Sequence, residues 1–139
     1  MKGSTSKIQS IAHLYEILPD DERLIVDVLR VLITSNLPPY CKEKISFSVP
    51  YFYGNKGICI IWPATIPRGG IMKGVLLGFW YENKLVDKEN YLTHGTNKQI
   101  FYKKYQNFTE INVEAIVQLL KEAIRLDGLH RNKGVKTAH

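Results

Sequence analysis

Residues 45–62, ISFSVPYFYGNKGICIIW, contain the clearest secondary-structure signals of this chain. Residues 45–49 alternate apolar and polar side chains, which predicts a strand with one wet face, and Pro50 places that strand at an edge or a bend. Residues 54–57 are typical of a turn, and residues 58–62 form a continuous apolar run that predicts a central strand. Because strands joined by short turns pair antiparallel, this stretch predicts an antiparallel meander.

The meander continues toward the C-terminus. A loop over residues 63–70 precedes a largely apolar segment, residues 71–81, which predicts a long strand. Residues 83–97 are mostly polar and predict an irregular segment, whereas the aromatic residues within 99–105 predict a further strand. The middle of the chain is therefore expected to hold three or more strands.

Helical patterns precede the meander. Apolar side chains at spacings of three and four predict a short helix over residues 7–18, which Pro19 ends. Asp20 is expected to cap a second amphipathic helix that runs to about Ser35.

A third helix is expected after the meander. Asn112 is a typical N-cap, and apolar side chains follow with helical spacing to about Leu126. Asp127 and Gly128 predict the end of this helix. Residues 128–139 show no periodicity, so we expect a flexible tail there.

Helices on both sides of an antiparallel meander predict an α+β fold. We expect a two-layer sandwich in which the N-terminal and C-terminal helices pack on one face of an antiparallel sheet. The length suits one domain over residues 1–139, with an ordered core over about residues 7–127.

Composition favours a soluble cytoplasmic protein. Cys41 and Cys59 are too few for a disulfide-built secreted domain. The N-terminus lacks the continuous apolar stretch of a signal peptide, and the apolar runs are too short to span a bilayer. The formal net charge is +6, but about five of the 19 Lys and Arg residues lie close to the two termini, so the folded body is less basic than the total indicates.

Several short motifs of the sequence indicate a family resemblance. The motifs are Tyr15-x-x-Leu18-Pro19, Leu29-Arg30, Leu37-Pro38, Ile45-Ser46-Phe47-Ser48-Val49-Pro50-Tyr51-Phe52, Trp62-Pro63-Ala64 and Pro67-x-Gly69-Gly70. Together they resemble the YdhG-like domain family, a bacterial domain of unknown function, over about residues 12–127. The resemblance implies an α+β fold with an antiparallel sheet, and it supplies no catalytic motif.

One member of that family has been described as a frataxin-like iron chaperone, so the resemblance implies iron handling as an alternative function. Hard cations prefer carboxylate oxygens, and the acidic residues concerned are Glu16, Asp20, Asp21 and Glu22. Favourable electrostatics at a helix start is the commoner explanation of such a cluster. A basic chain also departs from the acidic ridge that an iron chaperone is expected to carry.

Signals for catalysis or a resident metal are weak. Ser46 and Ser48 have no histidine near them in the sequence, so we expect a protein without enzymatic activity. The four histidines are scattered along the chain and pair with neither cysteine, so we expect no metal site and no cofactor.

The predicted strands are rich in aromatic residues: Phe47, Tyr51, Phe52, Tyr53, Trp62, Phe79, Trp80 and Tyr81. Consecutive strand residues point to opposite faces, and one core does not need so many rings. We therefore predict that the sheet face away from the helices is partly apolar and forms a small-ligand groove or a homodimer interface. The alternative is that all of these rings belong to the core.

The candidate ligand-binding residues are Tyr51, Tyr53, Trp62, Arg68 and Trp80. Arg68 precedes two glycines, and backbone N–H groups of such a loop can converge on an anion. A plain turn before the next strand is the commoner explanation of this loop.

Basic and aromatic residues also interleave around the last predicted strand, at Lys98, Phe101, Tyr102, Lys103, Lys104 and Tyr105. That mixture can bind single-stranded nucleic acid, but an edge strand protected by lysines is the favoured interpretation. The leading hypothesis is a small, non-enzymatic binding module whose partner is a small molecule or a second copy of the chain, rather than nucleic acid or a membrane. An iron chaperone is the first alternative, and nucleic-acid binding is the second.

Overall fold

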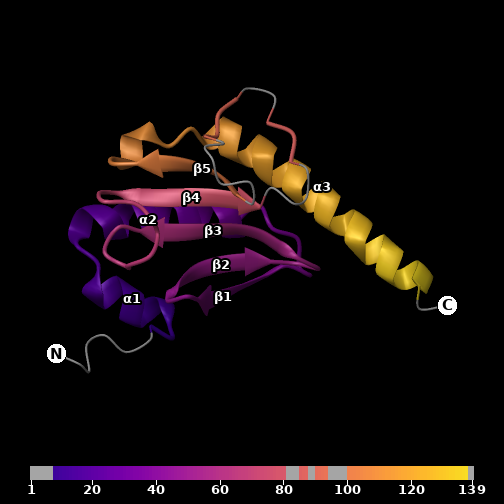
Figure 1. Cartoon of the computed structure of the whole chain (residues 1–139), viewed down its shortest axis with the longest axis horizontal. Coiled ribbons are helices and arrows are strands. Elements are labelled where there is room, and N and C mark those ends of the chain that lie inside the picture. The colour runs from indigo at the N-terminus through magenta and orange to yellow at the C-terminus, as the bar shows by residue number, and fades with distance from the viewer. Residues whose placement is uncertain (1–7, 81–84, 88–89, 94–99, 138–139) are drawn as a thin grey trace.

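The computed structural model describes residues 8–80, 85–87, 90–93 and 100–137 (Figure 1). Its helices are α1 (Ile11–Ile17), α2 (Asp20–Thr34) and α3 (Val113–Thr137), with a short 3-10 helix η3 (Phe108–Glu110). Its strands are β1 (Lys42–Ser46), β2 (Val49–Tyr53), β3 (Gly57–Pro63), β4 (Val75–Trp80) and β5 (Ile100–Tyr105).

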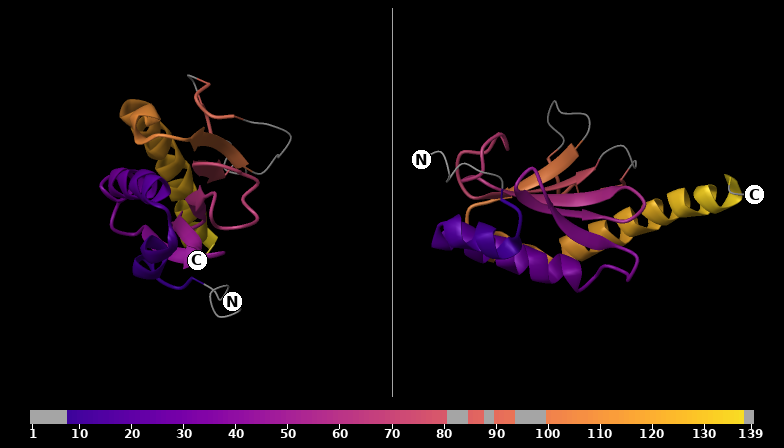
Figure 2. Two further views of the ribbon diagram at one scale, coloured as in Figure 1. Left: turned by 90° about the vertical axis from the view of Figure 1, so that its left-hand side faces the viewer. Right: turned by 90° about the horizontal axis from the view of Figure 1, so that it is seen from below.

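The strands form one antiparallel sheet in the order β1-β2-β3-β4-β5. The three α-helices lie on the same side of this sheet, and no described helix covers its other side (Figure 2). The α+β fold with two layers is thereby confirmed, and β3 is the central strand that its continuous apolar run predicts.

The hydrophobic core lies between the two layers. Helix α2 buries Ile25 and Leu29 of its predicted apolar face, but Leu24 of that face is exposed, and Val26 and Ile33 are buried instead. Helix α3 buries the apolar face that its spacing predicts. The largest fully buried side chains include Ile25, Leu29 and Ile33 of α2, Phe52, Leu77 and Phe79 of the sheet, and Ile116 and Leu120 of α3.

The two N-terminal helices begin differently from the prediction. Helix α1 begins at Ile11 rather than residue 7, because the Ser10 hydroxyl oxygen accepts a hydrogen bond from the backbone N–H of His13 at 3.0 Å. Pro19 occupies the N-cap position of α2, and Asp20 is the first helical residue rather than the cap. The three acids that open α2 still lie at the positive end of its dipole.

The strand predicted over residues 45–49 is wrong. A two-residue turn at Phe47 and Ser48 divides it, and Ser46 pairs with Val49 across the turn. Phe47 and Ser48 have φ angles of 56° and 68°, as in the type I′ turn of a tight hairpin. Glycine, asparagine and aspartate usually mark such turns, and neither position has one.

Strand β4 begins at Val75, not at residue 71 as predicted. The chain turns at Gly74, which has a φ of 84° and whose carbonyl accepts a hydrogen bond from the Ala64 N–H at 2.9 Å. A Cβ atom at Gly74 would lie 2.1 Å from the backbone oxygen of Tyr105, so glycine is required where β4 enters the sheet.

Between β4 and β5 the structure describes residues 85–87 and 90–93. These contain neither helix nor strand, apart from one antiparallel bridge from Thr93 to β5 at Tyr102. The rest of the predicted irregular segment, and the predicted strand ends at residues 81 and 99, lie outside the described residues.

Helix α3 begins as predicted but ends later. The Asn112 side-chain oxygen caps it by accepting a hydrogen bond from the Ala115 N–H at 3.0 Å. The predicted stop at Asp127 and Gly128 is wrong, because the helix continues to Thr137 and extends past the edge of the sheet (Figure 1). The segment predicted as a flexible tail is therefore helical as far as Thr137.

The side chain of Asp127 contacts residues outside its own helix. Its carboxylate is fully buried and accepts hydrogen bonds from the Tyr40 hydroxyl at 3.0 Å and from the backbone N–H groups of Asn55 and Lys56, both at 2.8 Å. Asp127 thus joins α3 to the β2–β3 turn.

Candidate functional site

The side of the sheet opposite the helices, here called the open face, carries alternate residues of all five strands. Pairing aligns Lys44 with Tyr51, Trp62 with Leu76, and Leu76 with Lys104. Most strand neighbours that point the other way, such as Phe52, Leu77 and Phe79, are buried in the core. The open face consists of Lys42, Lys44, Tyr51, Tyr53, Ile60, Trp62, Leu76, Trp80, Ile100, Tyr102 and Lys104.

A cavity of about 310 Å³ opens on this face, beside the loop that follows β3. Trp62, Arg68 and Trp80, all predicted from the sequence, line this cavity together. The other two predicted residues lie outside the cavity lining: Tyr51 contacts Trp80, and Tyr53 stacks on Tyr51.

The indole of Trp62 is held by the loop after β3. Its Nε1–H donates a hydrogen bond to the carbonyl oxygen of Ile66 at 2.8 Å. A Cβ atom at Gly69 would lie 2.3 Å from the indole ring, so this glycine lets the loop pack directly on it. Phe47 stacks on Trp62 with 6.3 Å between ring centroids. The ring that forms one wall of the cavity is therefore fixed before any ligand binds.

Trp80 is packed in a different way. Its ring lies 6.1 Å from that of Tyr51, which stacks on Tyr53 at 5.9 Å. A Cβ atom at Gly57 would lie 2.1 Å from Trp80 Nε1, so the indole rests directly on this glycine. Nε1 is buried and has no hydrogen-bond partner among the described residues. Buried donors are rarely left unpaired, so this N–H is unusual.

Cations accompany the rings at both edges of the open face. Lys44 Nζ lies 5.6 Å from the ring centroid of Tyr51 and 5.0 Å from that of Tyr53. Lys104 Nζ lies 5.6 Å from the ring centroid of Tyr102, and the exposed Arg68 stands at the cavity. Lysine over an aromatic ring is attracted by the ring quadrupole, so the cations are held close to the rings.

Carboxylates are absent from the described part of the open face. Among the strand residues the one acid is Glu43, which pairs with Arg30 of α2 on the helix side, at 2.6 Å and 2.8 Å. Hydrogen bonding to Glu43 raises the pKa of Arg30, which stays charged. The open face therefore presents aromatic rings and positive charge without neutralising acids.

The turn at Phe47 and Ser48 places a strained, exposed ring at the cavity. Phe47 is 72% exposed, and neither residue favours the positive φ angle that it adopts. Left-handed conformations of such residues cost about 1–2 kcal/mol each and tend to cluster at functional sites.

Replacing these two residues with the preferred pair (F47N/S48G) is expected to raise the free energy of unfolding by up to about 1 kcal/mol. Relief of the strain, about 1–2 kcal/mol at each residue, is partly offset by the lost ring stacking, about 0.5–1.5 kcal/mol, and by the extra chain entropy of glycine, up to about 1 kcal/mol. It is also offset by loss of the hydrogen bond from the Ile8 N–H to the Ser48 hydroxyl, about 0.5–1.5 kcal/mol. Urea denaturation measures the difference. Phe47→Ala, which removes the ring but keeps the strained turn, serves as the control and gains no stability. If the double variant is less stable than the natural chain, the turn at Phe47 and Ser48 is not strained.

The acidic residues of the iron hypothesis have local partners. Glu22 is buried and its carboxylate accepts a hydrogen bond from the Thr65 N–H at 3.1 Å. Asp20 forms an ion pair with Arg23, and Asp21 accepts from the N–H of Glu22 at 2.9 Å. Glu16 is exposed. Within the described residues no three His, Cys, Asp or Glu side chains converge as metal ligands.

The basic and aromatic strand β5 is divided between the two faces. Tyr102 and Lys104 lie on the open face, whereas Tyr105 is fully buried and Lys103 Nζ lies 4.7 Å from the ring centroid of Tyr91. Lys98 lies outside the described residues. The residues predicted to act together in nucleic-acid binding are separated because successive strand residues alternate between faces.

Three possible nucleophiles, Ser48, Cys41 and Cys59, are engaged in a hydrogen bond or buried. The Ser48 hydroxyl oxygen accepts a hydrogen bond from the Ile8 N–H at 3.2 Å. Burial raises the pKa of the Cys41 and Cys59 thiols, which disfavours the reactive thiolate.

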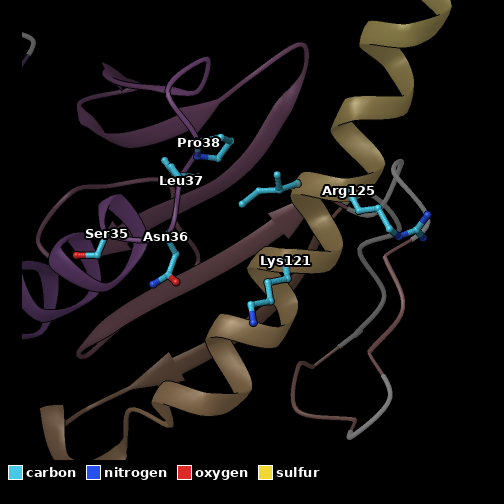
Figure 3. Close-up of a pocket in the computed structure, with 7 residues that line it drawn as sticks. Ser35, Asn36, Leu37, Pro38, Lys121 and Arg125 are labelled. Atoms are coloured by element: carbon cyan, nitrogen blue, oxygen red, sulfur yellow. The ribbon is translucent and has the colours of Figure 1, made fainter.

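A second, larger depression of about 580 Å³ lies between the end of α2 and α3 (Figure 3). It is shallow, and most of its polar lining is already paired. The Ser35 hydroxyl donates to the Val31 carbonyl at 2.6 Å, the Asn36 amide donates to a carbonyl of the same helix, and Arg125 pairs with Glu122. We therefore take the open face as the candidate site.

Of the residues on this face, sequence reasoning missed Lys44. It noted Phe47 among the surplus rings, and Tyr102 and Lys104 among the residues that could bind nucleic acid, but it placed none of the three with the tryptophans. Their proximity to the tryptophans depends on strand pairing, which composition does not give. One available signal was that the strands contain a single acid while their lysines cluster near aromatic residues.

No described helix has both the length and the apolar character needed to cross a bilayer. No family model matches the chain, and neither the curated proteins nor the solved structures contain a match to it. The resemblance to the YdhG-like domain family stays a prediction.

Proposed function

We propose that this protein is a small, non-enzymatic binding module whose open face holds a planar, negatively charged ligand. One observation carries the proposal: aromatic rings and cations share this face, and no described carboxylate lies among them. Tyr51, Tyr53, Trp62 and Trp80 supply flat apolar surfaces, and Arg68 supplies a donor that binds anions in bidentate fashion.

The size of the cavity supports a small ring system as the occupant. A volume of about 310 Å³ is at the lower end of the range for small-molecule sites. Stacking of one base on an aromatic side chain contributes about 1–3 kcal/mol, and it favours rings that are already fixed. Trp62 meets that condition through its hydrogen bond to Ile66.

Positive charge favours an anionic ligand over a second copy of the chain. A two-fold dimer uses the same patch on both subunits, so it would bring Lys42, Lys44 and Lys104 of each subunit toward those of the other. Like charges across an interface oppose association. Of the two partners predicted from the sequence, a second copy of the chain is therefore less favourable at the open face than a small anionic molecule.

The two cysteines are free and buried, which suits a reducing compartment such as the cytoplasm. The iron-chaperone alternative gains no support from the contacts of Asp20, Asp21 and Glu22, and it stays a prediction.

Intrinsic fluorescence tests the proposal directly, because both tryptophans of the chain line the cavity. Uridine monophosphate carries both a ring and an anion, so we expect it to quench the emission, with uridine weaker and orthophosphate without effect. Trp80→Ala is expected to weaken binding of uridine monophosphate by about 1–3 kcal/mol, because it removes one stacking surface.

Lys121→Ala is the matched control for Lys104→Ala, since both lysines are exposed and Lys121 lies on α3, away from the open face. We expect weaker nucleotide binding for Lys104→Ala and no change for Lys121→Ala. Equal binding by the natural chain, Trp80→Ala and Lys104→Ala would contradict the proposal.

A further inference from the structure

We infer that the physiological ligand of the open face is a single-stranded polynucleotide that crosses the strands from β1 to β5, an inference that rests on the proposed function. The cavity alone would suit one nucleotide. The rings and cations of the face, however, extend beyond the cavity in the direction perpendicular to the strands.

The face offers two separate stacking surfaces. Trp62 and Trp80 line the cavity, whereas the stacked pair of Tyr51 and Tyr53 lies outside its lining. Tyr51 joins the two surfaces, because its ring lies 6.1 Å from that of Trp80. A ligand with a single ring system occupies one of these surfaces, and a chain of bases occupies both.

Cations flank this row of rings at opposite edges of the sheet. Lys42 and Lys44 belong to β1, and Lys104 belongs to β5. These two strands are separated by four inter-strand spacings, roughly 19 Å. A mononucleotide reaches the cations of one edge, whereas the phosphates of an extended chain reach both edges. Sheets that present stacked aromatic residues in this way bind about two or three bases.

The same features select single strands over duplexes. Aromatic side chains stack only on bases that are not already stacked on both sides, and a paired helix hides its base faces. The rings of the open face belong to a sheet, and no described helix projects from that face to enter a groove. Electrostatic attraction by the lysines would bind single strands and duplexes alike, so the aromatic rings account for the preference for single strands.

The test compares uridine monophosphate with oligouridylates of two, four and eight nucleotides and with oligothymidylates of the same lengths, by tryptophan fluorescence. We expect the dissociation constant to fall at least tenfold from the monomer to the tetranucleotide and then to level off. An octamer duplex is expected to compete poorly. Tyr53→Ala is expected to weaken tetranucleotide binding more than monomer binding, because Tyr53 lies outside the cavity.

Salt dependence provides an independent readout. Contacts with about three phosphates give a slope of log K against log salt near −2 for a single strand. Lys44→Ala and Lys104→Ala are each expected to make the slope shallower by about 0.7, since each removes one phosphate contact. Lys121→Ala on α3 leaves the slope unchanged.

The outcomes separate the two proposals. Binding of uridine monophosphate without any gain in affinity with length overturns the polynucleotide inference and leaves the small-ligand proposal intact. Failure to bind both the monomer and the oligomers overturns both. An affinity that rises with length in the oligouridylates or in the oligothymidylates supports the inference. Tighter binding of the oligouridylates indicates that the ligand is RNA, recognised through its 2′-hydroxyl groups.

Discussion

Asp127→Ala is expected to lower the free energy of unfolding by about 2–4 kcal/mol. The carboxylate of Asp127 is fully buried and accepts hydrogen bonds from Tyr40, from the backbone N–H groups of Asn55 and Lys56, and from the side-chain amide of Asn55 at 3.2 Å. Alanine leaves these donors without an acceptor. Asn55 and Lys56 are exposed, so water replaces part of the loss and keeps the effect below that of a fully buried ion pair.

Two features sharpen this test. Alanine has a higher helix propensity than aspartate, by up to about 0.7 kcal/mol, so the measured loss underestimates the contribution of the network. Asp27→Ala is the matched control, because Asp27 is an exposed carboxylate of α2 that accepts one side-chain hydrogen bond, from Tyr15 at 2.9 Å. Urea denaturation should show a loss below about 1 kcal/mol for the control. Equal losses for the two variants would show that Asp127 does not hold α3 to the β2–β3 turn.

Gly74→Ala is expected to lower the free energy of unfolding by about 3 kcal/mol or more. Gly74 has a φ of 84°, and any residue with an L side chain adopts this conformation at a conformational cost of about 1–2 kcal/mol. The added Cβ would also lie 2.1 Å from the backbone oxygen of Tyr105, which cannot move away as a flexible side chain would. Relief requires β4 to shift away from β5 at the pair formed by Val75 and Tyr105, where both side chains are fully buried.

Gly70→Ala isolates the contribution of the clash. Gly70 has a similar φ of 69°, but a Cβ atom there would meet nothing within 4 Å. We expect the free energy of unfolding of this control to fall by about 1–2 kcal/mol, which is the cost of a positive φ for alanine alone. Thermal or urea unfolding of both variants gives the difference. If Gly74→Ala proves no more costly than Gly70→Ala, the close approach of the two strands at Gly74 is not a constraint.

The elements that depend on neighbouring residues were predictable. Helical spacing predicted that Ile25 and Leu29 share one face of α2, and Asn112 caps α3 through a residue three positions away. The continuous apolar run of β3 indicates a central strand. In each case the physical cause acts within a few residues of sequence.

The elements that depend on distant residues were not predictable. Asp127 was interpreted as part of a helix stop, but it lies within α3 and accepts a hydrogen bond from Asn55 of the β2–β3 turn, 72 positions away. The turn at Phe47 and Ser48 carries no sequence signal, because these residues adopt positive φ angles that only the pairing of β1 with β2 imposes.

The candidate site shows the same division. Composition alone pointed to Tyr51, Tyr53, Trp62 and Trp80 as surplus rings, because one core does not need so many aromatic residues. Only strand register decided that Lys44 and Lys104 share the face with those rings and that Lys103 lies on the other side. The reason is physical: the side-chain period of a strand is two residues, so a one-residue change of register moves every charge to the opposite face.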